Sequence, residues 1–465
     1  MKMIGAWNTK KNGKPKLRNI YLIDMSITQK IINYSLLLLI FLLPWQTRLI
    51  YRYAFLNGQP WEYGRLSLYG TEILIWLIVL LALIERVRKK YFWRNLSAPE
   101  YLKNNWKNLV FVLSFLVFNG LMIGHSLDPD ISYQHALRIL GGICLALVMA
   151  DFGPTIYKKA VGVLWASALV QSCLAVWQFF TQKISANKWL GLSAQDPSDA
   201  GVSVIQFANQ RWLRAYGSFG WPNSLGIYLA VCLVLGLMAY LFYRQSSQGN
   251  KKYDKIFLAG QLVILTGLIL SFSRGAWIGA VAGLFFLVFA YYKNSSARDF
   301  LAGQLAYYLV VVLIWLIILA PLFYARFNLD NSVEKVSIEE HRSQYGQSVG
   351  VIKNNLFLGV GSGAYTLNLY YNDPNLSGWQ YQPAHNIYVL WLAENGLIGI
   401  AFYFFIFLFL VYQLRRFNLP YLAVILVMAI GGFFDHWLWT LFGGMIFWWL
   451  VWGIGLASLQ AKKLV

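Results

Sequence analysis

Charged side chains are scarce in this sequence of 465 residues. Asp, Glu, Lys and Arg make up only 12% of the chain, whereas an ordinary soluble domain has about 25%. Apolar residues make up 58% and recur in long runs from one end to the other. A chain with so few charges cannot cover a water-facing surface, so the composition excludes a soluble globule, a disordered chain and a fibrous protein.

Cysteine is also rare. Cys144, Cys173 and Cys232 all lie inside apolar runs, and none forms a Cys-x-x-Cys pair. This placement argues against a disulfide framework and against a thiolate metal site. The sequence has no Walker motif, which argues against an ATP-driven pump. We find no convincing internal repeat or broken-helix symmetry of the kind that marks secondary transporters.

The apolar runs predict an all-α polytopic membrane protein with about twelve transmembrane helices. The runs are continuous, as in "YSLLLLIFLLP", and do not alternate as the strands of a membrane β-barrel do. A helix needs about 20 apolar residues to cross the hydrocarbon. The twelve candidate spans are 31–45, 67–84, 108–124, 133–150, 160–180, 224–243, 256–273, 275–292, 302–324, 386–412, 419–434 and 437–458.

Basic residues predict the orientation of these spans. With the N-terminus in the cytoplasm, the inner segments hold 26 of the 39 Lys and Arg residues and the outer side holds the other 13. Cytoplasmic loops carry the excess of Lys and Arg, so this two-to-one ratio places both termini inside. The net charge of +20 then comes from basic cytoplasmic loops of a protein whose partner is the lipid bilayer. It does not indicate binding to nucleic acid.

The chain is expected to form a single transmembrane domain over residues 31–458. A basic cytoplasmic tail, 1–30, precedes it, and a short cytoplasmic tail, 459–465, follows it. We expect the first nineteen residues to be disordered and not to form a cleaved signal peptide. Two long outer segments are expected at 181–223 and, partly helical and between the ninth and tenth spans, at 325–385. All five histidines lie at or near this outer face.

Two arginine motifs stand at the outer ends of spans. The first, "RWLRAYGSFGWPNSLGIYL", contains Arg211, Arg214 and Asn223. It is either a membrane-interface anchor or an anion-binding turn that leads into a helix. The second, "SFSRGAWIG", is a tight turn that places Ser273 and Arg274 at the outer membrane boundary. An arginine at that depth is costly and is usually functional or paired.

A third motif, "SIEEHRSQYGQSVGVIKNNLFLGVGSGAY", lies in the second outer segment. Ser337 and Glu340 form a capping-box pattern, which predicts a helix to about Asn354 with His341 and Arg342 in its first turn. The glycine-rich end resembles a phosphate loop, but no βαβ unit surrounds it, so a close-packed turn is the better interpretation. Acidic neighbours could join His341 in binding a metal, yet no second histidine follows at i+4, which disfavours a metal site.

The last two motifs border the final spans. In "PAHNIYVLWLAENGLIGI", His385 and Asn386 stand where the outer segment enters a span, and Glu394 follows inside the apolar run. A histidine at such a position is either a helix cap or a catalytic group. Asp435 and His436 form a short outer connection between the last two spans.

Asp128-Pro129-Asp130 offers a competing signal, because it fits the D-x-D pattern of nucleotide-sugar transferases. The expected topology places it outside, where nucleotide sugars are absent. A proline turn is therefore the better interpretation.

Together these motifs resemble the O-antigen ligase and O-antigen polymerase family. That family has an Arg, a Gly and a Pro-Asn pair before a span, a Ser-Arg-Gly-Ala turn, an Arg-bearing helix before a Gly-x-Gly turn, and a His-Asn pair before a Glu-x-Gly-hydrophobic-Gly run. The matching residues here are Arg214 and Gly217 with Pro222-Asn223, Ser273-Arg274-Gly275-Ala276, Arg342 with Gly359-Val360-Gly361, and His385-Asn386 with Glu394 to Gly399. The resemblance covers about residues 205–450.

The resemblance implies a metal-independent glycosyltransferase of the bacterial cytoplasmic membrane that needs no cofactor and acts on the outer face. Its donor would be a glycan on polyprenyl (undecaprenyl) diphosphate. Its acceptor would be a hydroxyl of lipid A-core for a ligase, or of a second glycan for a polymerase. Related pilin oligosaccharyltransferases use a protein hydroxyl. A transporter of the same lipid-linked glycan, a different class of protein, stays open as a further alternative.

The candidate residues suit that chemistry. Arginine forks match phosphate oxygens, so Arg214 and Arg274 are expected to bind the diphosphate, with Arg211 and Arg342 as weaker candidates. His385 is expected to be the catalytic base in an inverting displacement. The supporting residues are Asn223, Ser273, Asn386, Glu394 and Asp435, and Glu394, His341 and Asp435 are the substitutes if His385 is not the base. None of these residues is expected to bind a metal.

Overall fold

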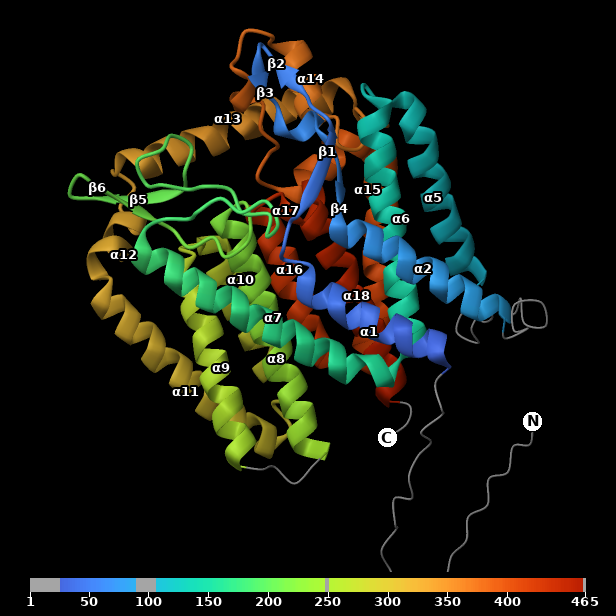
Figure 1. Cartoon of the computed structure of the whole chain (residues 1–465), viewed down its shortest axis with the longest axis vertical. Helices are drawn as coiled ribbons and strands as arrows, with labels where there is room; N and C mark the ends of the chain where they lie inside the picture. The colour runs from blue at the N-terminus through green and yellow to red at the C-terminus, as the bar shows by residue number, and fades with distance from the viewer. Residues whose placement is uncertain (1–25, 89–105, 247–250, 463–465) are drawn as a thin grey trace, which may run out of the picture.

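Long helices dominate the computed structural model, which describes residues 26–88, 106–246 and 251–462 (Figure 1). A helix occurs at each of the twelve predicted spans. These helices are α1 (Ile27–Leu42), α2 (Gly70–Arg88), α5 (Trp106–His125), α6 (Pro129–Phe152), α7 (Pro154–Thr181), α8 (Pro222–Ser246), α9 (Lys251–Leu270), α10 (Arg274–Ala290), α11 (Ser295–Ile318), α15 (Ile387–Phe417), α16 (Leu422–Phe434) and α18 (Phe442–Lys462). The predicted disorder of the first nineteen residues and the end of the C-terminal tail lie outside the described residues.

Seven of the described helices are long and apolar enough to cross a membrane: α6, α7, α8, α9, α11, α15 and α18. Shorter apolar helices occur in α1, α5, α10 and α16. On α11, Leu313, Ile314 and Ile317 are all exposed. Large apolar side chains gathered on an outer helix fit contact with lipid. The chain is therefore a multi-pass α-helical membrane protein, and its twelve spans and their orientation stay predictions.

Two predicted spans differ from the helices that form. In 67–84, the first residues belong to strand β4 (Leu66–Tyr69), and the helix begins only at Gly70. The predicted span 302–324 is divided between α11 and the short helix α12 (Ala320–Phe327). Pro321 lies in the first turn of α12, where its missing N–H is tolerated, whereas one continuous helix would lose a hydrogen bond there.

Three short antiparallel hairpins lie in the connections between helices, and the sequence analysis did not predict them. Strand β1 (Arg48–Arg52) pairs with β4, β2 (Phe55–Leu56) with β3 (Gln59–Pro60), and β5 (Val204–Phe207) with β6 (Gln210–Leu213). The two-residue turns Asn57-Gly58 and Ala208-Asn209 have positive φ at both positions, as the tightest hairpins require. Strands this short show no clear alternation of apolar and polar residues.

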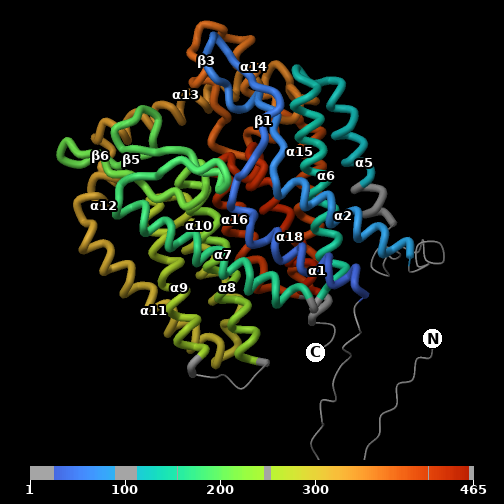
Figure 2. Tube along the Cα trace, viewed as in Figure 1, coloured from blue at the N-terminus to red at the C-terminus, as the bar shows by residue number. Residues whose placement is uncertain are grey.

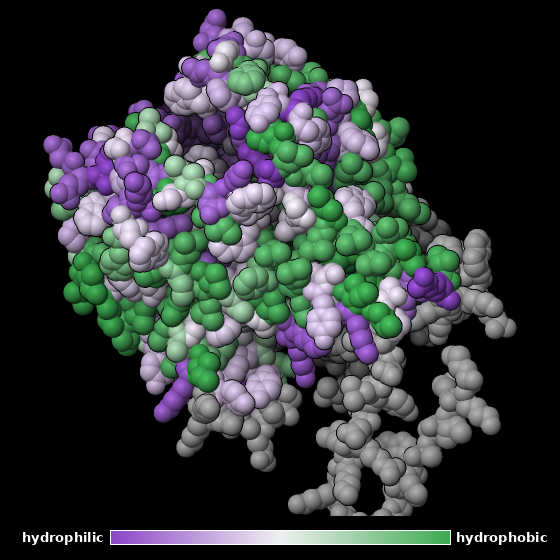
Figure 3. All heavy atoms as spheres, viewed as in Figure 1, coloured by the Kyte–Doolittle hydropathy of each residue, from purple (hydrophilic) through white to green (hydrophobic). Residues whose placement is uncertain are grey.

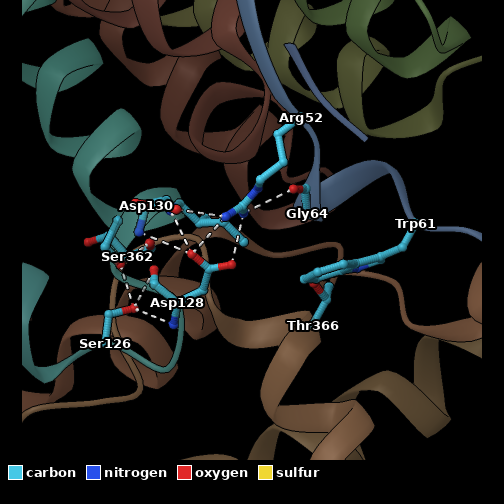
Figure 4. Close-up of polar contacts among 10 residues, drawn as sticks. Arg52, Trp61, Gly64, Ser126, Asp128, Asp130, Ser362 and Thr366 are labelled. Atoms are coloured by element: carbon cyan, nitrogen blue, oxygen red, sulfur yellow. Dashed lines mark hydrogen bonds and ion pairs between the residues drawn. The ribbon is translucent and has the colours of Figure 1, made fainter. Parts of the chain in front are cut away.

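Arg52 attaches the first hairpin to the start of α6 (Figure 4). Its guanidinium lies 2.8 Å from Asp128 and 3.0 Å from Asp130, and it also donates to the carbonyl oxygen of Gly64. The side chain of Asp128 accepts hydrogen bonds from the first N–H groups of α6, with Pro129 in the first turn. The Asp-Pro-Asp segment is thus a capping turn, in agreement with the sequence interpretation.

Helices that are distant in sequence pack side by side in the bundle. Figure 2 shows α18 beside α6 near the centre, and α10 packs against both α16 and α8. The segment between α12 and α15 lies outside this bundle of long helices. Its long helix α13 (Ser332–Asn354) runs across one end, followed by α14 (Tyr365–Asn372). A one-turn helix, α17 (Trp437–Thr440), precedes α18.

Hydrophilic side chains gather at the same end of the molecule as α13. In Figure 3 they surround a hollow at the top, near the β5–β6 hairpin, whereas apolar side chains cover the middle of this face. A band of apolar surface below a polar end is what a bilayer and an adjoining aqueous phase require. The candidate residues lie at this polar end.

Candidate functional site

The turn between α9 and α10 presents backbone oxygens to two arginines. Phe272 has a left-handed backbone (φ 48°), which tightens the turn. The carbonyl oxygen of Ser271 accepts a hydrogen bond from Arg214 Nε at 2.9 Å, and that of Phe272 accepts one from Arg326 Nε at 3.2 Å. Ser273 is buried beside them. This turn therefore brings together one arginine before α8 and another from α12.

Arg214, Arg274 and Arg326 form a cationic cluster around Glu334. Arg274 lies 3.0 Å from the carboxylate of Glu334, and Arg326 pairs with the other oxygen of the same carboxylate. Arg214 donates to the side-chain oxygen of Asn223 at 2.8 Å. In the part of the chain that the structure describes, Arg214 has no carboxylate within ion-pair distance. Three guanidinium groups thus lie near one carboxylate, which pairs with two of them.

Burial and like charge act together on this cluster. Burial lowers the pKa of Arg214, and the neighbouring Arg326 and Arg274 lower it further. Burial also lowers the pKa of Arg326, while Glu334 opposes that shift. A guanidinium still keeps its proton near neutral pH, so the cluster is a buried excess of positive charge. A bound anion would offset that excess.

Helix α13 links this cluster to a group of histidines. Glu334 and Ser348 are buried on it, and His341 lies midway between them at spacings of seven residues. Seven residues are about two helical turns, so these three side chains share one face and Glu334 is about 10 Å from His341 along the axis. One helix face therefore carries residues of both groups.

The first turn of α13 differs from the prediction. The helix begins at Ser332, where the side chain of Asn331 accepts a hydrogen bond from the N–H of Val333. Ser337 and Glu340 are consequently inside the helix, and the capping box assigned to them was wrong. An asparagine caps a helix as well as a serine does, so the earlier start has the same physical cause.

His341, His385 and His436 stand ring against ring. The ring centroids of His341 and His385 are 4.8 Å apart, and those of His385 and His436 are 5.1 Å apart in a nearly stacked arrangement. The three residues come from α13, from the segment before α15 and from the segment before α17. His385 Nδ1 is buried and has no hydrogen-bond partner among the described residues. This nitrogen therefore has no competing hydrogen bond from these residues.

The histidines are held in their neutral form. Burial lowers the pKa of His385 to about 4, and His436 lowers it further while Asp435 opposes the shift. Burial likewise lowers the pKa of His341 to about 4. The same cause lowers the pKa of His436, against the effect of Asp435. At neutral pH each ring is therefore uncharged and able to act as a base.

Asn386 provides the helix cap that could have been assigned to His385. Its side chain accepts hydrogen bonds from the N–H groups of Tyr388 and Val389 at the start of α15. The backbone N–H of His385 lies 3.4 Å from Gln344 of α13, a long hydrogen bond. The imidazole of His385 is thus not needed to cap the start of α15.

The two acidic candidates occupy different surroundings. Asp435 is buried next to His436 and accepts a hydrogen bond from the N–H of Trp437, at the start of α17. Glu394 is buried in α15, where it accepts a 2.7 Å hydrogen bond from the indole of Trp439 and others from the N–H groups of Gly363 and Tyr365. Glu394 therefore supports the glycine-rich segment.

That glycine-rich segment is a close-packed turn, in agreement with the sequence interpretation. Gly359 and Gly361 both have positive φ. A Cβ atom on Gly359 would lie 2.3 Å from the backbone of Glu394, so only glycine fits. Opposite it, Gly396 interrupts the helical geometry of α15 at φ 63°. The turn and the interrupted helix fit together backbone to backbone.

The structure does not bring Arg211 or Arg342 into the cationic cluster. Arg211 is exposed on β6 and donates to the carbonyl oxygen of Asp199. Arg211 lies beside the hairpin turn, whereas Leu213 at the other end of the strand is buried. Arg342 is exposed on α13 and, as the residue after His341, is turned away from that helix face.

Arg326 and Glu334 were missed by the sequence reasoning. Arg326 lies only two residues beyond a predicted span, in the same setting as Arg274, and that position was the available signal. Nothing in the sequence shows that Glu334 would pair with both arginines, since the contact depends on how α12 and α13 are arranged.

No metal site emerges from these clusters. Among residues 26–88, 106–246 and 251–462, no group of three or more His, Cys, Asp or Glu side chains is arranged to hold a metal ion.

The fold and the site define a multi-pass α-helical membrane protein with a cationic cluster and a neutral histidine cluster beside its spanning helices. Residues 259–404 match the family model described as O-antigen ligase. This segment of the chain is similar to the O-antigen ligase family, and it contains three of the motifs that carried the resemblance. The match contains Arg274, Arg326, Glu334, His341 and His385. No curated protein matches the chain.

Proposed function

We propose that this protein is a membrane glycosyltransferase that moves a glycan from polyprenyl diphosphate to an acceptor hydroxyl, such as one on lipid A-core. The reaction takes place at the outer face of the bacterial cytoplasmic membrane. The observation that carries the proposal is the cluster of three arginines around one carboxylate, linked by α13 to neutral histidines.

The cationic cluster supports diphosphate binding. A diphosphate gains negative charge as its bond to the sugar breaks, and guanidinium groups match its oxygens in pairs. Arg214 and Arg326 are fixed by backbone carbonyl oxygens of one turn, so they need little rearrangement to stabilise that charge. Loss of one such preorganised donor typically lowers the rate by about 10²–10³-fold.

The unpartnered nitrogen of His385 supports general-base catalysis. In the proposed step, the acceptor oxygen forms a bond to the anomeric carbon while the bond from that carbon to the phosphate oxygen breaks. The acceptor proton passes to His385, and the electron pair of the breaking bond leaves with the lipid diphosphate. Attack from the side opposite the diphosphate inverts the anomeric configuration.

A transfer assay tests the proposal. The purified protein in lipid nanodiscs is incubated with undecaprenyl diphosphate-linked glycan and, in separate reactions, with lipid A-core or a second lipid-linked glycan. Mass spectrometry of the products shows whether a glycosidic bond forms. Transfer to lipid A-core identifies a ligase, and transfer to the second glycan identifies a repeat-unit polymerase of the same family.

Two arginine variants make the assay specific to the site. Arg274→Lys keeps the charge but loses the guanidinium fork, so we expect turnover to fall by about tenfold or more. The control is Arg86→Lys, an exposed residue that pairs with Asp151 at the far end of α2. If folded wild-type protein transfers glycan to no acceptor but moves the lipid-linked glycan across the membrane, the protein is a transporter.

A further inference from the structure

A second polar cleft lies between the first hairpin and the bundle. It has about 680 Å³ of empty space, including the solvent at its mouth. Its walls come from the β1–β4 hairpin, α6, the glycine-rich segment and the start of α18. Arg48, Tyr63, Arg65, Arg138 and Thr440 are among the residues that line it. None of these five was among the candidate residues from the sequence, although Glu394, which was, also lines the cleft.

Each arginine of this cleft has a carboxylate partner, unlike Arg214 in the cationic cluster. Arg48 and Arg65 both pair with Glu62, at 2.6 and 2.7 Å. Arg138 lies 3.3 Å from Glu72. Glu62 and Glu394 line the cleft, and Glu72 pairs with Arg138 from outside it, so each of the three arginines has a carboxylate partner. Paired arginines attract an anion less strongly than an unpaired one such as Arg214 does, so this site suits a neutral ligand better.

Several polar atoms in the cleft are buried without partners. Arg65 Nε, Ser67 Oγ and His135 Nδ1 have no hydrogen-bond partner among the described residues, and all three residues line the cleft. Such atoms cost free energy unless a ligand or ordered water satisfies them. Unsatisfied donors and acceptors of this kind match the hydroxyl groups of a sugar ring.

The cleft shares a wall with the histidine cluster. Thr440 lines it, and the hydroxyl of Thr440 is 2.5 Å from His436 Nδ1. Tyr63 lines it too and packs edge-on against the His436 ring, with centroids 5.9 Å apart. His436 in turn stacks on His385. A ligand in the cleft would therefore lie next to His436, whereas His341 of α13 is at the other end of the row of histidines.

The hairpin that closes the cleft is fixed in place. Arg52 attaches it to α6 (Figure 4), and the indole of Trp61 donates to Thr366 of α14 at 3.2 Å. The side chain of Asn57 donates to the carbonyl oxygen of Leu376 at 2.6 Å. The cleft is thus a built site whose wall cannot swing away easily.

We propose that this cleft binds the acceptor as a neutral, polyhydroxylated sugar ring and directs one of its hydroxyls toward the histidine cluster. The acceptor role rests on the proposed glycosyltransferase function. The binding of a neutral sugar does not, so the two can be tested separately.

The binding test uses methyl β-glucoside and glucuronic acid as probes, without donor. Saturation-transfer NMR on the protein in nanodiscs should show binding of the neutral glycoside in preference to the acid. Arg65→Lys keeps the pair with Glu62 but removes the buried Nε donor, so it should weaken this binding by about tenfold. Arg86→Lys is the matched control and should bind as the wild type does. Preference for the acid, or equal binding by Arg65→Lys, would overturn the proposal.

The kinetic test separates this inference from the function itself. If the wild type transfers glycan, Arg65→Lys should raise the acceptor KM by about tenfold and leave the donor KM unchanged. Arg274→Lys should affect the donor side instead. A higher donor KM in Arg65→Lys would show that the cleft is not an acceptor site. Failure of the wild type to transfer any glycan would contradict the proposed function and leave the sugar-binding result standing.

Discussion

His385 combines three properties that a catalytic base needs. Its ring nitrogen is unpartnered, its ring is neutral at physiological pH, and the neighbouring Asn386 performs the capping that would otherwise occupy it. The sequence could locate His385 at a helix start but could not separate its role from capping. That separation depends on side-chain directions, which a sequence does not contain.

Two adjacent substitutions separate catalysis from capping. His385→Ala should fold, bind lipid diphosphate and lose about 10²–10⁴-fold in turnover. Asn386→Ala should instead lower stability by about 0.5–2 kcal/mol through loss of the cap and retain the chemistry. Thermal unfolding and single-turnover assays on both variants measure these effects. Near-normal transfer by a stable His385→Ala would remove it as the base and turn attention to His341, Glu394 or Asp435.

The pH profile provides a second check on His385. Because burial lowers its pKa to about 4, the folded protein keeps the base unprotonated well below the usual histidine range near 6.5. We expect kcat/KM to be flat from about pH 8 to about pH 5.5 and to fall as the pH approaches 4. The unfolded state binds the proton first, so this histidine also contributes stability that is present above about 6.5 and is lost as the pH falls toward 4. An acid limb centred near 6.5 would contradict the assignment.

At the scale of elements, α13 is the component that joins the two clusters. Its face with Glu334, His341 and Ser348 has the seven-residue spacing that a helix produces. The sequence predicted this helix and its end near Asn354, but not its start, and it could not show which partners the helix would meet. Arg326 reaches Glu334 because α12 ends beside α13, an arrangement set by packing of segments rather than by local propensity.

The interruption in α15 gives a prediction at the same scale. A Cβ atom on Gly396 would lie 2.2 Å from the backbone of Phe357, and the positive φ there is already unfavourable for other residues. Gly396→Ala should therefore destabilise the protein by more than about 1 kcal/mol and displace the glycine-rich segment. The matched control is Gly162→Ala in α7, where a Cβ meets nothing within 4 Å and should be neutral or stabilising. Thermal unfolding measures the stability of both variants. Equal unfolding temperatures would contradict the prediction.

At the scale of the whole molecule, hydropathy predicted a helix at every one of the twelve spans. Burial in lipid requires long apolar runs, and such runs are visible in a single sequence. The pairing of β1 with β4 was not visible, because the β2–β3 hairpin lies between them in the chain and Arg52 holds them through distant contacts. The cleft next to them was hidden for the same reason.

The orientation of the molecule is open to a direct test. With both termini inside, a thiol at the exposed position Asn375 should react with a membrane-impermeant reagent added to intact spheroplasts. A thiol at Lys255, near the start of α9, should react only after the membrane is opened. Cys173 is exposed in the structure, so it is replaced first in both variants. Protection at 375 together with labelling at 255 would reverse the predicted topology.

The excess of arginine over carboxylate also bears on how the reaction cycle ends. Breaking the bond to the sugar leaves a terminal phosphate with one more ionisable oxygen than the donor had. Three guanidinium groups should therefore hold the spent carrier lipid more tightly than the loaded one. We expect a fast first turnover followed by a slower steady state that added undecaprenyl diphosphate inhibits, measured by rapid-quench kinetics. Equal rates in both phases would show that the carrier leaves freely. A slower steady state would show that the charges that help the bond to break also make release of the carrier lipid the slow step.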